Sequence, residues 1–166
     1  TISAHLEILG EGVRPDHALV NAEGDFYQTL DVDKNFLPFG KAPSIDTTFY
    51  LASDEILGQK DSRVRIEFEL SDQTVADVPQ ASEDLVLRWE YYNGKRWKLL
   101  SRVVGGEVDG ATHGFEDGTS GFMTSGAVTF DLPGDLAGTE VSGNASRWVR
   151  CRIQNGGFGV PGSYEL

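Results

Sequence analysis

The stretch LVLRWEYYNGKRWKLL, residues 85–100, is the part of the chain that most clearly indicates a fold. Two runs of apolar and aromatic residues flank the pair Asn93-Gly94. An Asn-Gly pair between two such runs is a strong sequence indication of a β-hairpin. The stretch therefore predicts two antiparallel strands, 85–91 and 95–100, joined by a tight turn.

The register of this hairpin can be predicted from the side chains that would face each other. A two-residue turn would place both tryptophans of the stretch opposite charged residues. A type I turn with Gly94 as a left-handed bulge residue instead pairs Glu90 with Arg96 and Trp89 with Trp97. A slip of one residue moves every side chain of a strand to the opposite face, so burial selects strongly between the two registers. We therefore expect Trp89 and Trp97 to be cross-strand neighbours with mostly buried rings.

Alternating apolar and polar residues predict further strands on both sides of the hairpin. Residues 63–70 alternate most clearly. The other predicted strands are 2–9, 26–32, 47–51, 127–132 and 147–153. Ser53 can cap the only helix-compatible window, residues 53–57. Several short strands with loops between them predict an all-β fold, an antiparallel two-sheet β-sandwich with long loops and less than ~15% helix.

The length of 166 residues suits a single domain, or a single domain with an added arm. Residues 10–25 contain turn-forming glycines, a proline and an asparagine. We therefore expect an N-terminal strand and loop arm at residues 1–35, followed by a β-sandwich domain at residues 36–166. Residues 105–121 carry six glycines and few apolar residues, so we expect a long exposed loop there.

The charge balance of 14 basic against 26 acidic residues gives a net charge of −12. Such a chain repels the phosphate backbone of nucleic acids and the anionic surface of membranes, so neither is an expected partner. No apolar run approaches the ~18 residues of a membrane-spanning helix, and no signal peptide is expected. Cys151 is the only cysteine, which excludes a disulfide within the chain.

No familiar catalytic or nucleotide-binding motif occurs in the sequence. The three histidines are far apart along the chain. Alternation within 147–153 places Cys151 beside Val149 and Ile153 on an apolar face, where a cysteine behaves as a small hydrophobic residue. We therefore expect no catalytic residues and no cofactor, and a structural or binding role is favoured over an enzyme.

Four acidic residues of the 105–121 stretch are weak candidates for a calcium site, because calcium takes carboxylate oxygens from flexible loops. Their order does not match that of an EF-hand, and a solvated loop is the alternative interpretation. The four residues are Glu107, Asp109, Glu116 and Asp117.

The opposite face of the 147–153 strand carries Trp148, Arg150 and Arg152, a local reversal of sign in an acidic chain. Two interpretations are open. In the first, the two arginines pair with acids on neighbouring strands and hold the sheet together. In the second, Trp148 and one arginine form a docking patch, since both residue types are enriched at binding hot spots. The acids considered as partners are Glu67, Glu69 and Glu90.

Several segments occur in the order found in a known family. They are Phe39-Gly40-x-x-Pro43; Phe49-Tyr50-Leu51-Ala52-Ser53-x-Glu55; Trp89-Glu90-Tyr91-Tyr92-Asn93-Gly94-x-x-Trp97-x-x-Leu100; Asp117-Gly118-Thr119-x-x-Phe122-x-x-Ser125-Gly126-x-Val128-x-Phe130-x-x-Pro133-x-Asp135; and Trp148-Val149-Arg150-x-Arg152. This order resembles the β-sandwich module of baseplate J-like assembly proteins in contractile phage tails and related injection systems. The resemblance covers roughly residues 36–160.

The resemblance implies a rigid spacer or docking module without catalytic residues. Its expected partners are other baseplate or tail subunits. It would assemble in the bacterial cytoplasm and end in the virion tail or injection-system baseplate. The alternative is a carbohydrate-binding sandwich, in which exposed aromatic rings stack on a glycan. The rings that could form such a platform are Trp89, Tyr91, Tyr92 and Trp97.

Overall fold

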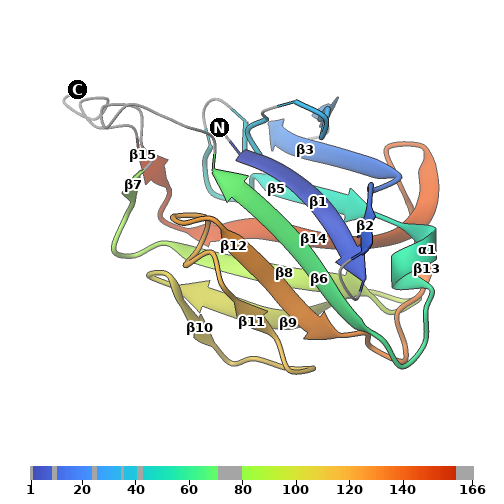
Figure 1. Cartoon of the computed structure of the whole chain (residues 1–166). Helices are drawn as coiled ribbons and strands as arrows, with labels where there is room; N and C mark the ends of the chain where they lie inside the picture. The colour runs from blue at the N-terminus through green and yellow to red at the C-terminus, as the bar shows by residue number, and fades with distance from the viewer. Residues whose placement is uncertain are drawn as a thin grey trace.

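The computed structural model describes residues 2–8, 11–23, 26–34, 36–40, 43–70 and 80–159 (Figure 1). The chain is 52% strand and 3% helix, and its two antiparallel sheets pack together. This confirms the predicted all-β sandwich and its low helix content.

The smaller layer is a five-stranded sheet. Its strand order is β11 (Glu116–Asp117), β12 (Gly126–Asp131), β6 (Arg63–Leu70), β1 (Ile2–Ile8) and β2 (Glu11–Val13). Strand β6 has the predicted bounds, and its Val64, Ile66 and Phe68 are buried. The alternation that predicted this strand therefore also identifies its core face.

The larger layer is an eight-stranded sheet, called here the large sheet. Its order is β10 (Glu107–Asp109), β9 (Trp97–Val104), β8 (Val86–Tyr92), β14 (Asn144–Asn155), β5 (Thr48–Ala52), β3 (His17–Glu23) and β4 (Phe26–Thr29), and β13 (Gly138–Val141) pairs with β14. Strands β7 (Gln80–Ala81) and β15 (Phe158–Gly159) form a separate pair. Among the described residues there is one helix, α1 (Asp54–Leu57). Ser53 caps it as predicted, and its Oγ accepts the Ile56 N–H.

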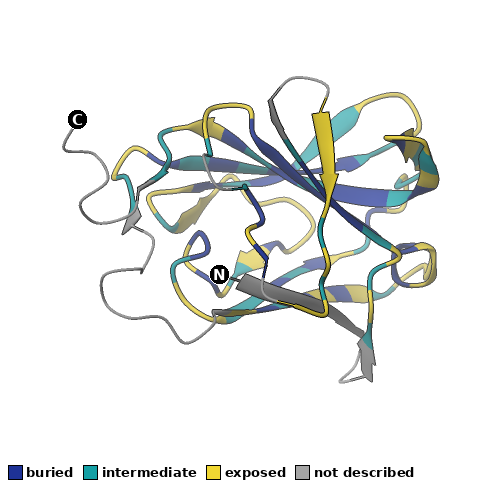
Figure 2. Cartoon of the chain, turned by 90° about the horizontal axis from the view of Figure 1, so that it is seen from above, coloured by how far each residue is buried: buried dark blue, intermediate teal, exposed yellow. Residues whose placement is uncertain are grey.

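The main core lies between the two sheets, where the central strands of both layers carry buried residues (Figure 2). Trp89 from the large sheet is 1% exposed and contacts Phe68 from β6, together with Phe115 and Phe122. A second, smaller apolar cluster is separate from this main core. It consists of Leu19, Tyr50, Ala52, Val141 and Trp148, with Trp97 packed against it. The large sheet therefore carries buried apolar residues on both of its faces.

The predicted arm at residues 1–35 is wrong as a separate unit. Strand β1 pairs with β6 from Ile2 opposite Leu70 to Glu7 opposite Arg65, and β3 lies between β5 and β4. The first 35 residues thus contribute strands to both sheets. The strands that pair with β1 and β3 are distant in sequence, so local sequence patterns do not show that these strands join the same sheets as residues 36–166.

The predicted register of the β8–β9 hairpin is also wrong. Trp97 pairs with Tyr92, while Trp89 pairs with Ser101, and the register shifts between Trp89 and Glu90. The turn is four residues long, because the Asn93 Oδ1 accepts the N–H groups of both Lys95 and Arg96. These bonds lengthen the turn and move Trp97 to the face opposite Trp89.

Asn93 and Gly94 themselves do form the turn as expected. Gly94 has a φ of 93°, in the left-handed region that glycine adopts without strain. The Asn93 N–H donates to the Arg96 carbonyl at 3.0 Å, which closes the turn.

The stretch 105–121 is only partly the exposed loop that we expected. Its β10 and β11 pair with β9 and β12, and Phe115 is buried at 3% exposure. Phe115 packs on Trp89 and Phe130, so this Gly-rich stretch closes one side of the core.

A hydrogen bond from the Tyr91 hydroxyl to Asp135 Oδ1, 2.8 Å long, makes stability sensitive to alkaline pH. Burial, followed by this hydrogen bond, raises the pKa of Tyr91 to about 12. An unfolded tyrosine ionises near pH ~10, so the stabilisation from Tyr91 is complete below that pH and is lost as pH rises toward 12. We expect the stability difference between wild type and Tyr91→Phe to shrink across this range in urea melts. A constant difference from pH 9 to 12 contradicts this assignment.

Candidate functional site

A cluster of charged residues centred on Glu90 lies on the outer face of the large sheet, the face turned away from the five-stranded sheet. Arg88, Glu90 and Tyr92 alternate along β8 with the buried Leu87, Trp89 and Tyr91. Since Trp89 packs against β6, the alternate residues project outward. This outer face is therefore defined by the register of β8 with β9 and β14.

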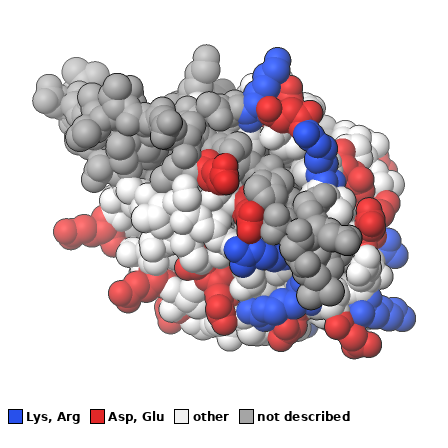
Figure 3. Space-filling view, in the orientation of Figure 1, with Lys and Arg blue, Asp and Glu red and all other residues white. Residues whose placement is uncertain are grey.

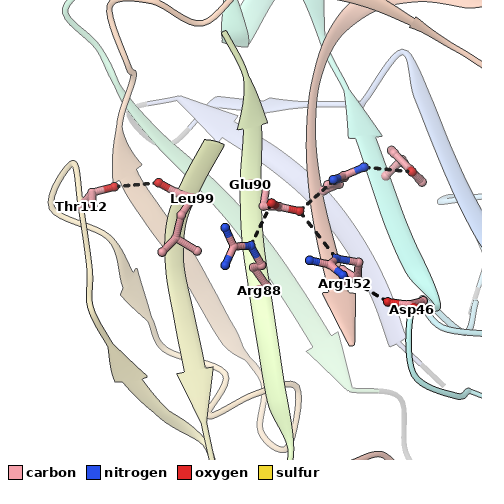
Figure 4. A network of polar contacts seen from close by, with 8 residues as sticks. Asp46, Arg88, Glu90, Leu99, Thr112 and Arg152 are labelled. Carbon is pink, nitrogen blue, oxygen red and sulfur yellow. Dashed lines mark hydrogen bonds and ion pairs between the residues drawn. The ribbon is translucent and has the colours of Figure 1, made fainter. Parts of the chain in front are cut away.

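Glu90 is the centre of the cluster, and its side chain is only 4% exposed. It accepts the Nε–H of Arg88 at 2.9 Å and the Nε–H of Arg150 at 3.0 Å, while Arg152 Nε lies 3.8 Å away. Figure 4 shows the Glu90 carboxylate between Arg88 and Arg152, with Asp46 beyond Arg152. A buried carboxylate is tolerated because three guanidinium groups surround it.

Arg150 joins this charge cluster to a group of aromatic rings. Its guanidinium carbon lies 4.2 Å from the centre of the Trp97 ring, and its Nη1 donates to the Tyr50 hydroxyl at 3.4 Å. Tyr50 and Tyr92 each meet Trp97 edge-on, with ring centres 5.9 and 5.5 Å apart. Arg150 is thus held by an ion pair on one side and a cation–π contact on the other.

The interpretation in which the arginines of the 147–153 strand pair with acids on neighbouring strands holds for one of the three acids considered, Glu90. Arg150 and Arg152 both approach Glu90, and Arg152 also bonds Asp46 at 3.1 Å. Glu67 and Glu69 were wrong as partners, because they lie on β6 in the other sheet. Glu67 pairs with Arg65 there, and Figure 3, drawn in the orientation of Figure 1, shows basic groups lying beside acidic ones.

Trp148 cannot serve as the exposed docking residue that we considered, because it is 0% exposed. Strand β13, which the sequence did not predict, folds back on β14 and brings Val141 into the same cluster. His17 stacks on the Trp148 ring at 5.7 Å. The half-buried tryptophan of this face is instead Trp97, which the sequence predicts to lie in the core.

The four candidate calcium ligands are not brought together. Asp109 pairs with Arg102 at 3.0 Å, and Glu116 lies 3.6 Å from Arg63. Asp117 accepts the backbone N–H groups of Thr119 and Gly121, so its role is to hold a turn. In the part of the chain that the structure describes, no three His, Cys, Asp or Glu side chains converge as metal ligands would.

The four rings considered for the alternative, a sugar-stacking platform, do not share one surface. Trp89 and Tyr91 are each 1% exposed and face the main core, whereas Tyr92 and Trp97 lie on the outer face. Only the latter two rings of the four reach the surface, and they meet edge-on.

Cys151 lies in the core beside Val149 and Ile153, as predicted. Burial raises the pKa of its thiol well above the usual value, and the nearby Asp117 and Glu90 act in the same direction. The thiol therefore remains protonated and packs as an apolar side chain.

We expect Arg150→Ala to lower stability more than Arg152→Ala. Arg150 loses a charge-assisted bond to a buried carboxylate and a cation–π contact, together about 2 kcal/mol. Arg152 bonds the exposed Asp46, and such pairs contribute about 0–1 kcal/mol. Urea unfolding of the two variants measures the difference, and an equal loss contradicts the geometry described for Arg150.

Fold and site together define an antiparallel β-sandwich with an arginine- and aromatic-rich outer face. No protein-family model matches the chain, and no curated protein or solved structure matches it either. Within the described residues, no helix is long and apolar enough to span a membrane.

Proposed function

We propose that this chain is a non-catalytic structural or docking module of a baseplate protein in a contractile tail or related injection system. Its partners in this proposal are neighbouring baseplate or tail subunits. It assembles with them in the bacterial cytoplasm and remains in the finished tail or baseplate. The observation that carries the proposal is the partly exposed group of Trp97, Arg150 and Tyr92 on the outer face, since Trp, Tyr and Arg dominate protein-binding hot spots.

The residues that carry the family resemblance support a scaffold role in a second way. Most of them are framework residues: Phe49, Trp89 and Phe130 are buried in the core, and Ser53 caps α1. Gly94 forms the hairpin turn. The residues that carry the resemblance thus mainly hold the fold together, and a rigid fold suits a spacer between other subunits.

The test uses the source cell, with an epitope tag on the native protein that contains this chain. We expect the tag to co-purify with assembled particles, and an in-frame deletion of the chain to leave sheaths without complete baseplates. A tagged chain that is absent from purified particles contradicts the proposal.

Trp97→Ser tests the docking face within the same assay, and Phe26→Ser is its matched control. Phe26 is an exposed ring on β4, 80% accessible, at the edge of the large sheet. We expect Trp97→Ser to reduce the yield of complete particles while Phe26→Ser leaves it unchanged. If Phe26→Ser reduces the yield and Trp97→Ser does not, the contact with the neighbouring subunit lies at the β4 edge instead.

Carbohydrate binding remains the alternative proposal. The separation of the four rings onto two faces gives it no extended stacking surface, and a glycan array tests it directly. Saturable binding of a neutral glycan that Trp97→Ser abolishes would favour this alternative over the docking module.

A further inference from the structure

Three arginines lie directly opposite one another across three adjacent strands of the outer face. Arg88 on β8 pairs with Arg102 on β9 and with Arg152 on β14. Residues directly opposite in antiparallel strands have Cα atoms about 5 Å apart, and like charges at that separation are unfavourable. We call these three residues the arginine row. A chain with a net charge of −12 therefore concentrates positive charge at one place.

We propose that the arginine row binds the carboxylates of an acidic, extended segment of a neighbouring protein. This inference rests on the proposed function and names the chemistry of the partner at the same face. Arg88 is the central contact, and Arg102 and Arg152 are the flanking contacts.

Among the residues that the structure describes, the charges of the arginine row are only partly balanced. The row and Arg150 supply four positive groups, whereas Glu90, Asp46 and Asp109 supply three negative ones. Two of these acids are well exposed, since the side chains of Asp46 and Asp109 are 75% and 57% accessible. Exposed pairs of this kind are weak, so an incoming carboxylate can compete with them.

Arg88 has donor groups to spare. Its Nε donates to Glu90, and among the described residues no other hydrogen bond or ion pair involves its side chain. The two Nη groups therefore have no partner among the described residues. The Arg88 side chain is 29% exposed. A pair of Nη groups in one plane matches the two oxygens of a carboxylate.

The spacing of the arginine row suits an extended peptide. Neighbouring strands lie about 5 Å apart, so the outer arginines of the row are separated by roughly 10 Å. Alternate side chains of an extended chain are about 7 Å apart. Acids at alternate positions can thus reach Arg88 and one neighbour together. The net charge of −12 disfavours nucleic acid, whose dense phosphates would meet repulsion from the rest of the molecule.

The experiment titrates the isotope-labelled protein with the peptide acetyl-Ser-Glu-Ser-Glu-Ser-Glu-Ser-amide and follows the arginine side-chain signals by NMR. We expect saturable shifts at Arg88 and Arg102, and none with the peptide in which glutamine replaces glutamate. Arg102→Gln should weaken binding about five-fold, because it removes one flanking charge-assisted contact. The Arg102 side chain is 41% exposed and, among the described residues, bonds only the exposed Asp109, so this variant should fold normally.

Lys95→Gln is the matched control, because it makes the same change in net charge at an exposed position in the β8–β9 turn. We expect it to bind like wild type. Equal weakening by both variants, or no saturable shift in wild type, overturns the inference. Binding of an acidic uronic-acid oligosaccharide but not of the peptide overturns it too. These failures are separable from failure of the proposed function, which depends on whether the chain is found in purified particles.

Discussion

Trp89→Ala should lower the free energy of unfolding by about 3–5 kcal/mol, the range for removing a large aromatic side chain from a core. Trp89 is 1% exposed and touches the ring of Phe68 on β6 and the rings of Phe115 and Phe122, which lie before and after β11. For a domain of this size, the loss corresponds to a decrease in Tm of roughly 6–20 °C. Calorimetry or urea unfolding measures it.

Trp97→Ala is the comparison that separates the two tryptophans. Trp97 is only partly buried and lies on the outer face, so we expect a loss of about 1–2 kcal/mol. Trp89→Phe should be milder than Trp89→Ala, because phenylalanine keeps an aromatic ring in the core while both substitutions remove the buried Nε1–H, which has no hydrogen-bond partner among the described residues. Equal losses for Trp89→Ala and Trp97→Ala would support the register expected from sequence and contradict the one described here.

Glu90→Gln should have the second-largest effect, a loss of about 3 kcal/mol. The substitution keeps the size of the side chain but leaves Arg88, Arg150 and Arg152 around a neutral group. Their mutual repulsion is then uncompensated in a partly buried setting. A loss of this size lowers Tm by roughly 6–12 °C. Added salt should restore part of it, because salt screens the repulsion between the partly exposed arginines.

Glu140→Gln provides the control for Glu90→Gln. Glu140 is exposed on β13, and its substitution makes the same change in net charge. We expect a change within about 0.5 kcal/mol, as for most surface substitutions. Similar Tm values for the two variants would mean that Glu90 does not organise the outer face.

Local patterns were sufficient to predict the sandwich and several of its elements. Alternation placed β6 correctly because one face of that strand is buried and the other is not. The Ser53 cap was predictable because it depends on residues within one turn of helix. The same holds for Cys151, whose neighbours two residues away share its buried face.

Features set by distant segments could not be predicted in this way. The hairpin register depends on two irregularities, the four-residue turn held by Asn93 and the shift between Trp89 and Glu90. Each irregularity moves the side chains that follow it to the other face of the sheet. A wrong prediction of the turn length therefore also gives the wrong face for Trp97. Trp148 was misplaced because β13, with one buried apolar residue at Val141, gave no strand pattern.

The candidate site was predicted in part. The sequence identified a strand of reversed charge and gave Glu90 as one partner for its arginines, which the ion pair of Arg150 confirms. The arginine row was missed, because it requires the register that brings Arg102, Arg88 and Arg152 opposite one another. A correct register for the β8–β9 hairpin would have shown two of these three residues from sequence alone.

The most direct test of the docking account is a structure of the purified contractile particle by electron cryomicroscopy, at a resolution that places side chains. We predict that the sandwich lies in the baseplate with the outer face of its large sheet against a neighbouring subunit, and with Trp97 and Arg88 in the contact. A sandwich whose outer face is open to solvent, while its neighbours bind the five-stranded sheet, would contradict the account.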